Sequence, residues 1–202
     1  MWDSGRTPTR VIRHGVRVPP ELSYAGDLPK AISVVNNLPS RGRRTGEDVF
    51  RRVRESIPID LAGMGSEDLG GLGDLPLNRL HSVEVRYRLF FNPIRYTSLG
   101  LAVCEAMMLG LPIVGLATTE MAVAVENGVS GYVDTDVGRL IEFMRQLLDD
   151  PVEARRLGEG ARRRSQDVFG LGRFVSDWRE TFEDVAGRRF DPVAVPSGRR
   201  EP

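Results

Sequence analysis

Short apolar runs alternate with segments of helical spacing along most of the chain. The apolar runs predict strands at residues 10–13, 32–36, 59–62, 87–93, 113–117 and 131–133. Periodicity and capping signals predict helices at residues 47–56, 77–83, 101–109, 120–126, 137–148, 152–165 and 173–185. Strands that alternate with helices favour an α/β fold, in which a Rossmann-like parallel sheet carries helices on both faces.

The segment 96–119 holds a single charged side chain, Glu105, among apolar, small and hydroxyl residues. In the predicted helix 101–109, Glu105 shares a face with Leu101, Cys104 and Met108. Removing a carboxylate from water costs several kcal/mol unless another group compensates. Glu105 therefore needs a partner, and the neighbouring sequence supplies no cation.

The loop before this helix suggests a ligand as that partner. It contains Thr97, Ser98 and Gly100, and it connects the end of a strand to the start of the helix. Free N–H groups and the positive dipole end at such a position favour phosphate. Glu105, one turn further in, would then meet the hydroxyls of a ribose. Two alternatives stay open: Glu105 pairs with a distant arginine, or Thr97 and Ser98 only cap the helix.

Residues 97–136, TSLGLAVCEAMMLGLPIVGLATTEMAVAVENGVSGYVDTD, resemble the donor-binding half of a known enzyme family. The family is the retaining glycosyltransferases of family four, which have the two-domain GT-B fold. Its signature has two Glu separated by seven residues, in the form E-P-F-G-L-x-x-x-E-A-M-A-x-G-x-P-V-V. The resemblance extends from about residue 9 to residue 185. It implies that this chain has the fold of the C-terminal GT-B domain. It also implies that Glu105 holds the nucleotide ribose, while backbone amides of Leu99, Gly100 and Leu101 hold the diphosphate.

The chain differs from the family at three places. Thr97 occupies the position of the first Glu, which in the family contacts the transferred sugar. Near the first family strand, Asn36 and Asn37 replace Gly-Arg, so the cationic role passes by resemblance to Arg41, Arg43 or Arg44. A solvated charged loop is the alternative for these arginines. The family's Gly-Gly-x-x-Glu loop would fall at Thr119, Glu120 and Val123.

Composition narrows the class of protein. The 28 basic and 28 acidic residues of the 202-residue chain balance, so no global field favours nucleic acid or an anionic membrane. One cysteine excludes an internal disulfide and suits a reducing compartment. The N-terminus has no apolar signal-peptide core, and no apolar stretch approaches the roughly 20 residues of a spanning helix. We therefore expect a cytoplasmic protein with no transmembrane segment.

The remaining motifs favour structural roles. Asp136, in the sequence Asp-Thr-Asp, precedes a predicted helix and is expected to be its N-cap, so no metal is expected. Cys104 is expected to be a small buried residue. His14 is expected in a turn, and His81 on the surface. The sequence predicts no cofactor, and it lacks the Gly-x-Gly-x-x-Gly of a dehydrogenase.

The predicted elements and the family resemblance together indicate the domain organisation. Residues 1–186 are expected to form one Rossmann-like domain that binds a nucleotide sugar, and residues 187–202 a disordered tail. The resemblance implies an N-terminal acceptor domain of roughly 170 residues, which this sequence does not contain. In the family the last helix crosses to that domain. Here its apolar stripe would pack on the chain's own sheet or on a partner, and it comprises Phe174, Trp178, Phe182 and Val185.

The resemblance thus implies a hexosyltransferase of the group 1, family 4 type, for which this chain supplies the donor-binding half. The expected donor is a UDP-, GDP- or ADP-sugar, and the expected protein partner is a separate N-terminal acceptor-domain chain. No catalytic residue is identified. The alternative is a non-catalytic domain that binds a nucleotide sugar or docks to a partner.

Overall fold

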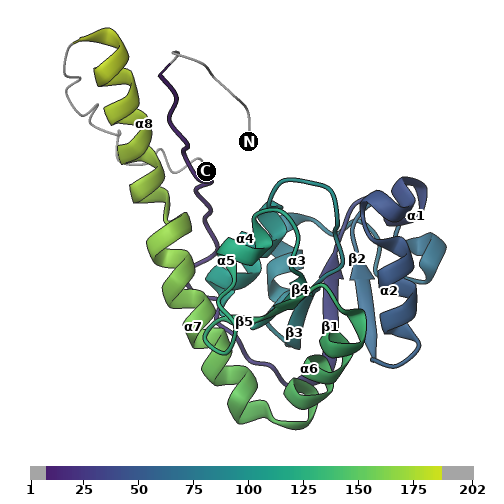
Figure 1. The fold of residues 1–202 in the computed structure, drawn as a ribbon. Coiled ribbons are helices and arrows are strands. Elements are labelled where there is room, and N and C mark those ends of the chain that lie inside the picture. Colours follow the sequence, from purple (N-terminus) through teal and green to yellow (C-terminus); the bar gives the residue numbers. More distant parts are fainter. Residues whose placement is uncertain (1–7, 188–202) are drawn as a thin grey trace, which may run out of the picture.

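The computed structural model describes residues 8–187. These residues contain a five-stranded sheet in which all strands run parallel. The strand order is β2-β1-β3-β4-β5 (Figure 1). The strands are β1 (Leu28–Val34), β2 (Ile59–Ala62), β3 (Tyr87–Asn92), β4 (Ile113–Leu116) and β5 (Gly131–Asp134). Every position of β3 and β4 is buried, as expected for inner strands covered on both faces.

Helices cover both faces of the sheet. The longer helices are α2 (Glu47–Arg54), α3 (Leu77–Glu84), α4 (Leu101–Leu109), α6 (Val137–Asp149), α7 (Pro151–Phe169) and α8 (Leu171–Ala186). The short ones are α1 (Leu38–Arg41), α5 (Met121–Ala124) and the 3-10 turns η1 (Gly42–Arg44) and η2 (Glu67–Leu69). One apolar cluster joins the sheet to α2 and α6, and a second joins the opposite face to α4, α5 and the C-terminal part of α7. The predicted Rossmann-like fold is confirmed.

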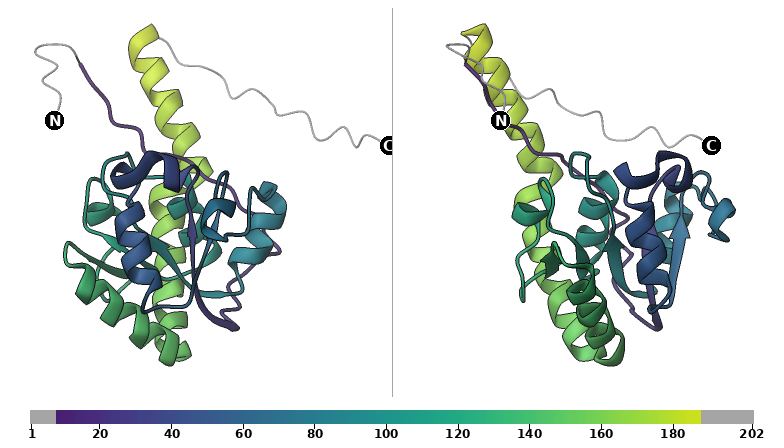
Figure 2. Two further views of the ribbon diagram at one scale, coloured as in Figure 1. Left: turned by 90° about the vertical axis from the view of Figure 1, so that its right-hand side faces the viewer. Right: turned by 45° about the vertical axis from the view of Figure 1, so that its right-hand side comes forward.

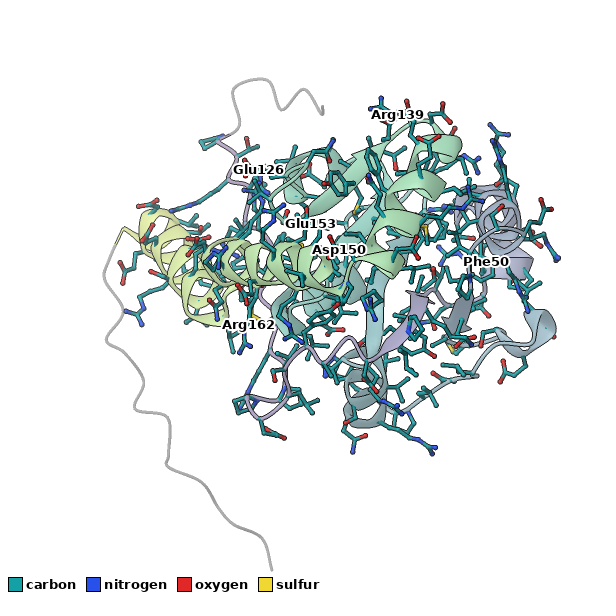
Figure 3. The ribbon with its side chains drawn as sticks, turned by 90° about the horizontal axis from the view of Figure 1, so that it is seen from below. Phe50, Glu126, Arg139, Asp150, Glu153 and Arg162 are labelled. Carbon is teal, nitrogen blue, oxygen red and sulfur yellow. The ribbon has the colours of Figure 1, made fainter. Side chains whose placement is uncertain are left out.

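Side-chain caps define the start of two helices. Asp136 Oδ1 accepts from the N–H of Gly138, so the predicted N-cap of α6 is confirmed. Asp150 lies at the junction of α6 and α7, and its carboxylate accepts from the N–H groups of Val152 and Glu153 at 3.0 and 2.9 Å (Figure 3). These bonds satisfy amides that a helix start leaves without a partner.

The predicted strand at residues 10–13 is wrong, because this segment pairs with α8 through side chains instead of joining the sheet. Arg10 forms an ion pair with Glu180 at 2.5 Å, and Arg173 donates to the carbonyls of Arg13 and His14. The backbone of Gly15 lies directly against the side chain of Phe174. Residues 8–15 therefore run beside α8 (Figures 1 and 2).

Helix α8 projects beyond the sheet as a near-continuation of α7 (Figures 1 and 2). No residue of α8 is buried, and Trp178 and Phe182 stack on each other at 5.3 Å in an exposed position. The predicted apolar stripe is present, but it does not pack on the chain's own sheet. The predicted tail lies outside the described residues, apart from Gly187. Within the described part, no helix combines the length and the apolar character needed to cross a membrane.

Candidate functional site

The direction of the strand order changes between β1 and β3. From β1 the chain moves outward to β2, returns to β3 on the other side of β1, and continues to β4 and β5. In open parallel sheets, ligands bind outside the carboxyl ends of the strands at such a point. The loops that follow β1 and β3 meet here, and together with α4 they carry every residue for which the sequence predicts a role in donor binding.

The loop after β1 is folded rather than irregular. It contains α1 and η1, and the buried hydroxyl of Thr45 donates to the carbonyls of Leu38 and Gly42 at 3.3 and 3.2 Å. Asn37 adopts a left-handed conformation with φ of 56°. Arg41 and Arg43 project into solvent, and neither has an ion pair within residues 8–187. Both guanidinium groups are therefore available to an anion at the edge of the sheet.

The loops after β1 and β3 are fastened together. The carbonyl of Arg44 accepts from the N–H of Tyr96 at 3.2 Å, and its guanidinium donates to the Tyr96 carbonyl at 3.4 Å. Gly46 has a φ of +82°, and a Cβ there would lie 1.9 Å from the carbonyl oxygen of Pro93. The contact between these two backbones therefore requires glycine at residue 46.

The N-terminus of α4 is open. Its N-cap is Gly100, no side chain caps it, and a Cβ on Gly100 would meet no atom within 4 Å. Thr97 donates to the Ser98 carbonyl at 2.8 Å, so the alternative in which Thr97 and Ser98 cap this helix is wrong. Leu99 is buried and anchors the turn, whereas Leu101 is half exposed. The first N–H groups of α4 therefore have no side-chain partner within the described part of the chain, and the anion site predicted here stays a prediction.

The loop after β2 reaches the same edge. The N–H of Met64 donates to Asn36 Oδ1 at 3.0 Å, and its carbonyl accepts from the N–H of Asn37 at 2.7 Å. Three loops from neighbouring strands thus surround the carboxyl ends of β1 and β3. The glycine-rich segment 63–73 belongs to this group.

Glu105 faces α3 from the second turn of α4. Its side chain is 16 % exposed, and its Oε2 lies 3.6 Å from Nε2 of His81. His81 is 1 % exposed, so the expectation that it is a surface residue is wrong. The sequence did not indicate this neighbour, because His81 lies 24 positions earlier and meets Glu105 only when α3 packs on α4.

Glu84 is the functional candidate that sequence reasoning missed. It ends α3 and is 1 % exposed, and both of its carboxyl oxygens are buried without a hydrogen-bond partner in the described structure. Burial, followed by the neighbouring charge of Glu105, raises the pKa of Glu84 from its ordinary value of 4.5 to about 8. Its flanking residues, Val83 and Val85, were the available signal that the position is apolar.

The remaining residues that the sequence analysis singled out have environments typical of structural roles. Cys104 is fully buried, and burial followed by the charge of Glu105 raises the pKa of its thiol to about 12. Thr119 occupies a position at which the family that the sequence resembles has glycine. Its φ of 48° is a rare conformation for a β-branched residue. Among residues 8–187, no cluster of three or more His, Cys, Asp or Glu has a geometry suited to a metal ion.

Comparison with known proteins identifies related enzymes. A family model described as "Glycosyl transferases group 1" matches residues 71–150, which include β3, α4, β4, β5 and α6. The chain is 34 % identical to D-inositol 3-phosphate glycosyltransferase 1 of Catenulispora acidiphila over 104 residues, which are 48 % of this chain and 24 % of that protein. It is 31 % identical to glycogen synthase of Mycobacterium tuberculosis over 232 aligned residues, which span 100 % of this chain and 52 % of that protein.

Solved structures share the fold at low sequence identity. Sucrose-phosphate synthase from Thermosynechococcus elongatus superposes with a TM-score of 0.67 and 19 % identity, over 84 % of this chain and 47 % of that one. TarM of S. aureus, solved in complex with UDP, superposes with a TM-score of 0.70 and 14 % identity, over 86 % of this chain and 39 % of that one. Anabaena HepE, solved in complex with UDP-glucose, superposes with a TM-score of 0.60 and 16 % identity, over 78 % of this chain and 48 % of that one.

The chain spans between a quarter and about half of the length of the curated relatives that it matches. The structural neighbours are GT-B glycosyltransferases, and the chain again covers less than half of each of the three described. Residues 71–150 thus match the glycosyl transferases group 1 model, within a Rossmann-like fold that the chain shares with GT-B glycosyltransferases.

Proposed function

We propose that this chain binds the nucleotide-sugar donor of a glycosyltransferase and forms the donor-binding half of an enzyme that transfers a hexose with retention. One observation carries the proposal: the segments that follow β1 and β3 at the switch point hold an uncapped helix start, a mostly buried carboxylate one turn further in, and two arginines with no ion pair among residues 8–187. The complexes of TarM with UDP and of HepE with UDP-glucose support a uridine nucleotide as the first ligand to test.

In this proposal the diphosphate lies at the N-terminus of α4. Backbone amides around Leu99, Gly100 and Leu101 donate to its oxygens, and the helix dipole adds a favourable field. Arg41 and Arg43, from the loop after β1, supply the positive charge that the family places differently. Asn37 contributes an amide side chain at the same edge.

Glu105 then accepts hydrogen bonds from the ribose hydroxyls. Charge-assisted bonds of this type contribute roughly 1.5–3 kcal/mol each. Glu105 lies one turn inside α4, about 5.4 Å along the helix axis from a phosphate bound at its start. The partner that the carboxylate needs would thus be the ligand itself, with His81 as a neighbouring protein group.

The residues of this chain would promote transfer by positioning the donor and by neutralising charge. The arginines and the amides at the start of α4 stabilise the negative charge that develops on the departing diphosphate. Thr97 replaces the family's carboxylate beside the transferred sugar with a hydroxyl, which is half-buried and near the start of α4. Relatives named as a glycosyltransferase and a glycogen synthase do not favour the non-catalytic alternative.

Acceptor binding is assigned in this proposal to a second Rossmann-like domain. The exposed apolar stripe of α8 is the surface that such a domain would cover, since aromatic side chains are stacked there in contact with solvent. Residues 8–15, which run along α8, would lie in the same interface. The domain is expected on a separate chain or on the same polypeptide.

A thermal-shift panel tests donor binding. UDP, GDP, ADP and their sugar conjugates are added to the wild-type chain, to Glu105→Ala and to Glu142→Ala, in which an exposed glutamate of α6 is removed. A ligand at a hundred times its Kd stabilises the folded state by about 2.7 kcal/mol. We expect one nucleotide to raise the Tm of the wild type and of Glu142→Ala, and not of Glu105→Ala. Equal shifts in all three chains would refute the role of Glu105.

A further inference from the structure

A groove separates the segment 16–20 from α7, next to the start of α8. Its volume is about 310 Å³, at the lower end of the range of small-molecule sites. Two arginines, Arg17 and Arg162, line it together with the amide side chain of Gln166, and none of its lining residues is Asp or Glu. Most of the remaining wall is apolar and includes Pro19, Pro20, Met108 and Leu171. The groove therefore gathers two positive charges without an acidic residue in its wall.

Arg162 is held in place by packing but has no counter-charge. It belongs to the C-terminal half of α7 and is partly buried (Figure 3). A Cβ on Gly110 would lie 3.9 Å from its Cδ, so its aliphatic stem packs on the C-terminal end of α4. The neighbouring Arg163 pairs with Glu159, whereas the Arg162 guanidinium makes neither an ion pair nor a hydrogen bond within residues 8–187. Partial burial of an unpaired charge is unfavourable unless another group compensates.

The backbone before Arg17 brings this second cation to the groove. The N–H of Val16 donates to the carbonyl of Phe169 at 2.9 Å, so the chain is fastened to the end of α7 one residue before Arg17. Gln166 lies one turn after Arg162, on the same face of α7. Arg17 is exposed and, like Arg162, has no ion pair in the part of the chain that the structure describes. The two guanidinium groups thus reach one groove from separate segments.

A structural role does not explain these two arginines. Cations near a helix C-terminus often donate to backbone carbonyls, and Arg164 does so, since it donates to the carbonyls of Val123 and Ala124. Arg162 makes no such bond to any described residue. Like charges in one partly enclosed groove repel each other, so the arrangement is favourable only with an anion between them.

The groove is separate from the proposed donor site. In the proposed function the diphosphate lies at Gly100, at the start of α4, whereas Met108 and Gly110 are at the other end of that helix. From Gly100 to Met108 the helix rises roughly 12 Å. The anion that fits the groove is therefore a second ligand, and the inference does not rest on the proposed function.

We propose that this groove binds a phosphate monoester of a small organic molecule, with Arg17 and Arg162 holding the phosphate group. Arginine binds phosphate through paired hydrogen bonds, and a monoester carries about −1.5 to −2 at neutral pH, close to the charge of two guanidinium groups. A carboxylate would leave one arginine without a counter-charge. The apolar wall holds the organic part of the ligand. Because Arg17 and Arg162 belong to separate segments, the ligand joins them at the junction of α7 and α8.

The experiment measures the Kd of phenyl phosphate and of inorganic phosphate by calorimetry, with the whole 202-residue chain at neutral pH. It compares the wild type with Arg162→Gln and Arg17→Gln, each of which removes one proposed phosphate ligand. Arg163→Gln is the matched control, because it removes an exposed arginine from the next position of α7. Arg41→Gln removes a cation of the proposed donor site instead. Circular dichroism confirms that each variant is folded.

We expect phenyl phosphate to bind the wild type, Arg163→Gln and Arg41→Gln alike. It should bind Arg162→Gln and Arg17→Gln at least about tenfold more weakly, because each lacks charge-assisted hydrogen bonds to the phosphate. Inorganic phosphate should bind the wild type more weakly than the ester does, since it makes no apolar contact.

Three results would contradict the proposal. Absence of binding to the wild type, or equal affinity of Arg162→Gln and Arg163→Gln, would overturn it. A loss in Arg41→Gln but not in Arg162→Gln would assign the phosphate to the start of α4 and overturn the groove as its site. Equal wild-type affinities for inorganic phosphate and phenyl phosphate would overturn the role of the apolar wall, and with it the choice of an organic ester.

Discussion

At the scale of single residues, the candidate site depends on how the side chains of α3 and α4 meet where these two helices pack. The sequence predicted that Glu105 needs a partner, because the carboxylate shares a helix face with apolar residues. It did not predict His81 or Glu84, since both belong to a helix more than 20 positions away and meet Glu105 only through packing of α3 on α4. Long-range contacts of this kind leave no periodic pattern in the sequence.

Gly46 is a residue at which the backbone geometry of the site requires glycine. An alanine there would require a left-handed conformation and would bring its Cβ within 1.9 Å of the Pro93 carbonyl oxygen. Strain of this type alone costs about 1–3 kcal/mol. We expect Gly46→Ala to lower the free energy of unfolding by at least that amount, measured by urea denaturation, and to weaken nucleotide binding. Gly172→Ala is the control, because a Cβ there meets nothing within 4 Å. Equal stabilities of the two variants would contradict the proposed contact.

At the scale of elements, the sequence predicted most helices and strands within a few residues. Strand 59–62 and helix 101–109 have the predicted bounds because turn or capping residues flank each apolar run. The strand at 10–13 was wrong because a short run carries little periodic information, and its ion pairs with α8 determine its path. The sequence predicted no helix at residues 38–44, which fold into α1 and η1 and contact Thr45.

Helices α7 and α8 are expected to differ in their contribution to stability. Phe169, the last residue of α7, is 1 % exposed, and removal of such an aromatic side chain costs about 3–5 kcal/mol. Phe182 of α8 is 54 % exposed, so its loss is expected to cost less than about 1 kcal/mol. Urea denaturation of Phe169→Ala and Phe182→Ala measures the difference. Comparable losses would mean that α8 packs on the domain in solution.

At the scale of the whole molecule, titratable groups with shifted pKa values predict a stability maximum in weakly acidic solution. Hydrogen bonds from Arg95 and Arg156 lower the pKa of Asp48 and Glu153, so their contribution to stability is lost as the pH falls. Glu84 has the opposite sign. Its folded pKa of about 8 exceeds its ordinary 4.5, so the folded state binds more protons between these values, and stability falls as the pH rises through them.

Thermal unfolding of the free chain from pH 4 to pH 9 checks this prediction. We expect the wild type to lose stability between about pH 5 and pH 8, in the window that the pKa of Glu84 defines. The decline should be reduced in Glu84→Gln and retained in Glu142→Gln. A wild-type stability that rises steadily through this window would show that Glu84 has no raised pKa in the folded state.

The central claim is that the carboxylate of Glu105 binds the ribose of a nucleotide, and a calorimetric titration with matched ligands tests it most directly. The nucleotide that stabilises the chain and its 2′-deoxy analogue are each titrated into the wild type and into Glu105→Ala. Loss of one charge-assisted hydrogen bond, about 1.5–3 kcal/mol, predicts that the deoxy analogue binds the wild type at least about tenfold more weakly. In Glu105→Ala both ligands should bind with the same, weaker affinity. An equal loss on removal of the hydroxyl in both chains would contradict contact between Glu105 and the ribose.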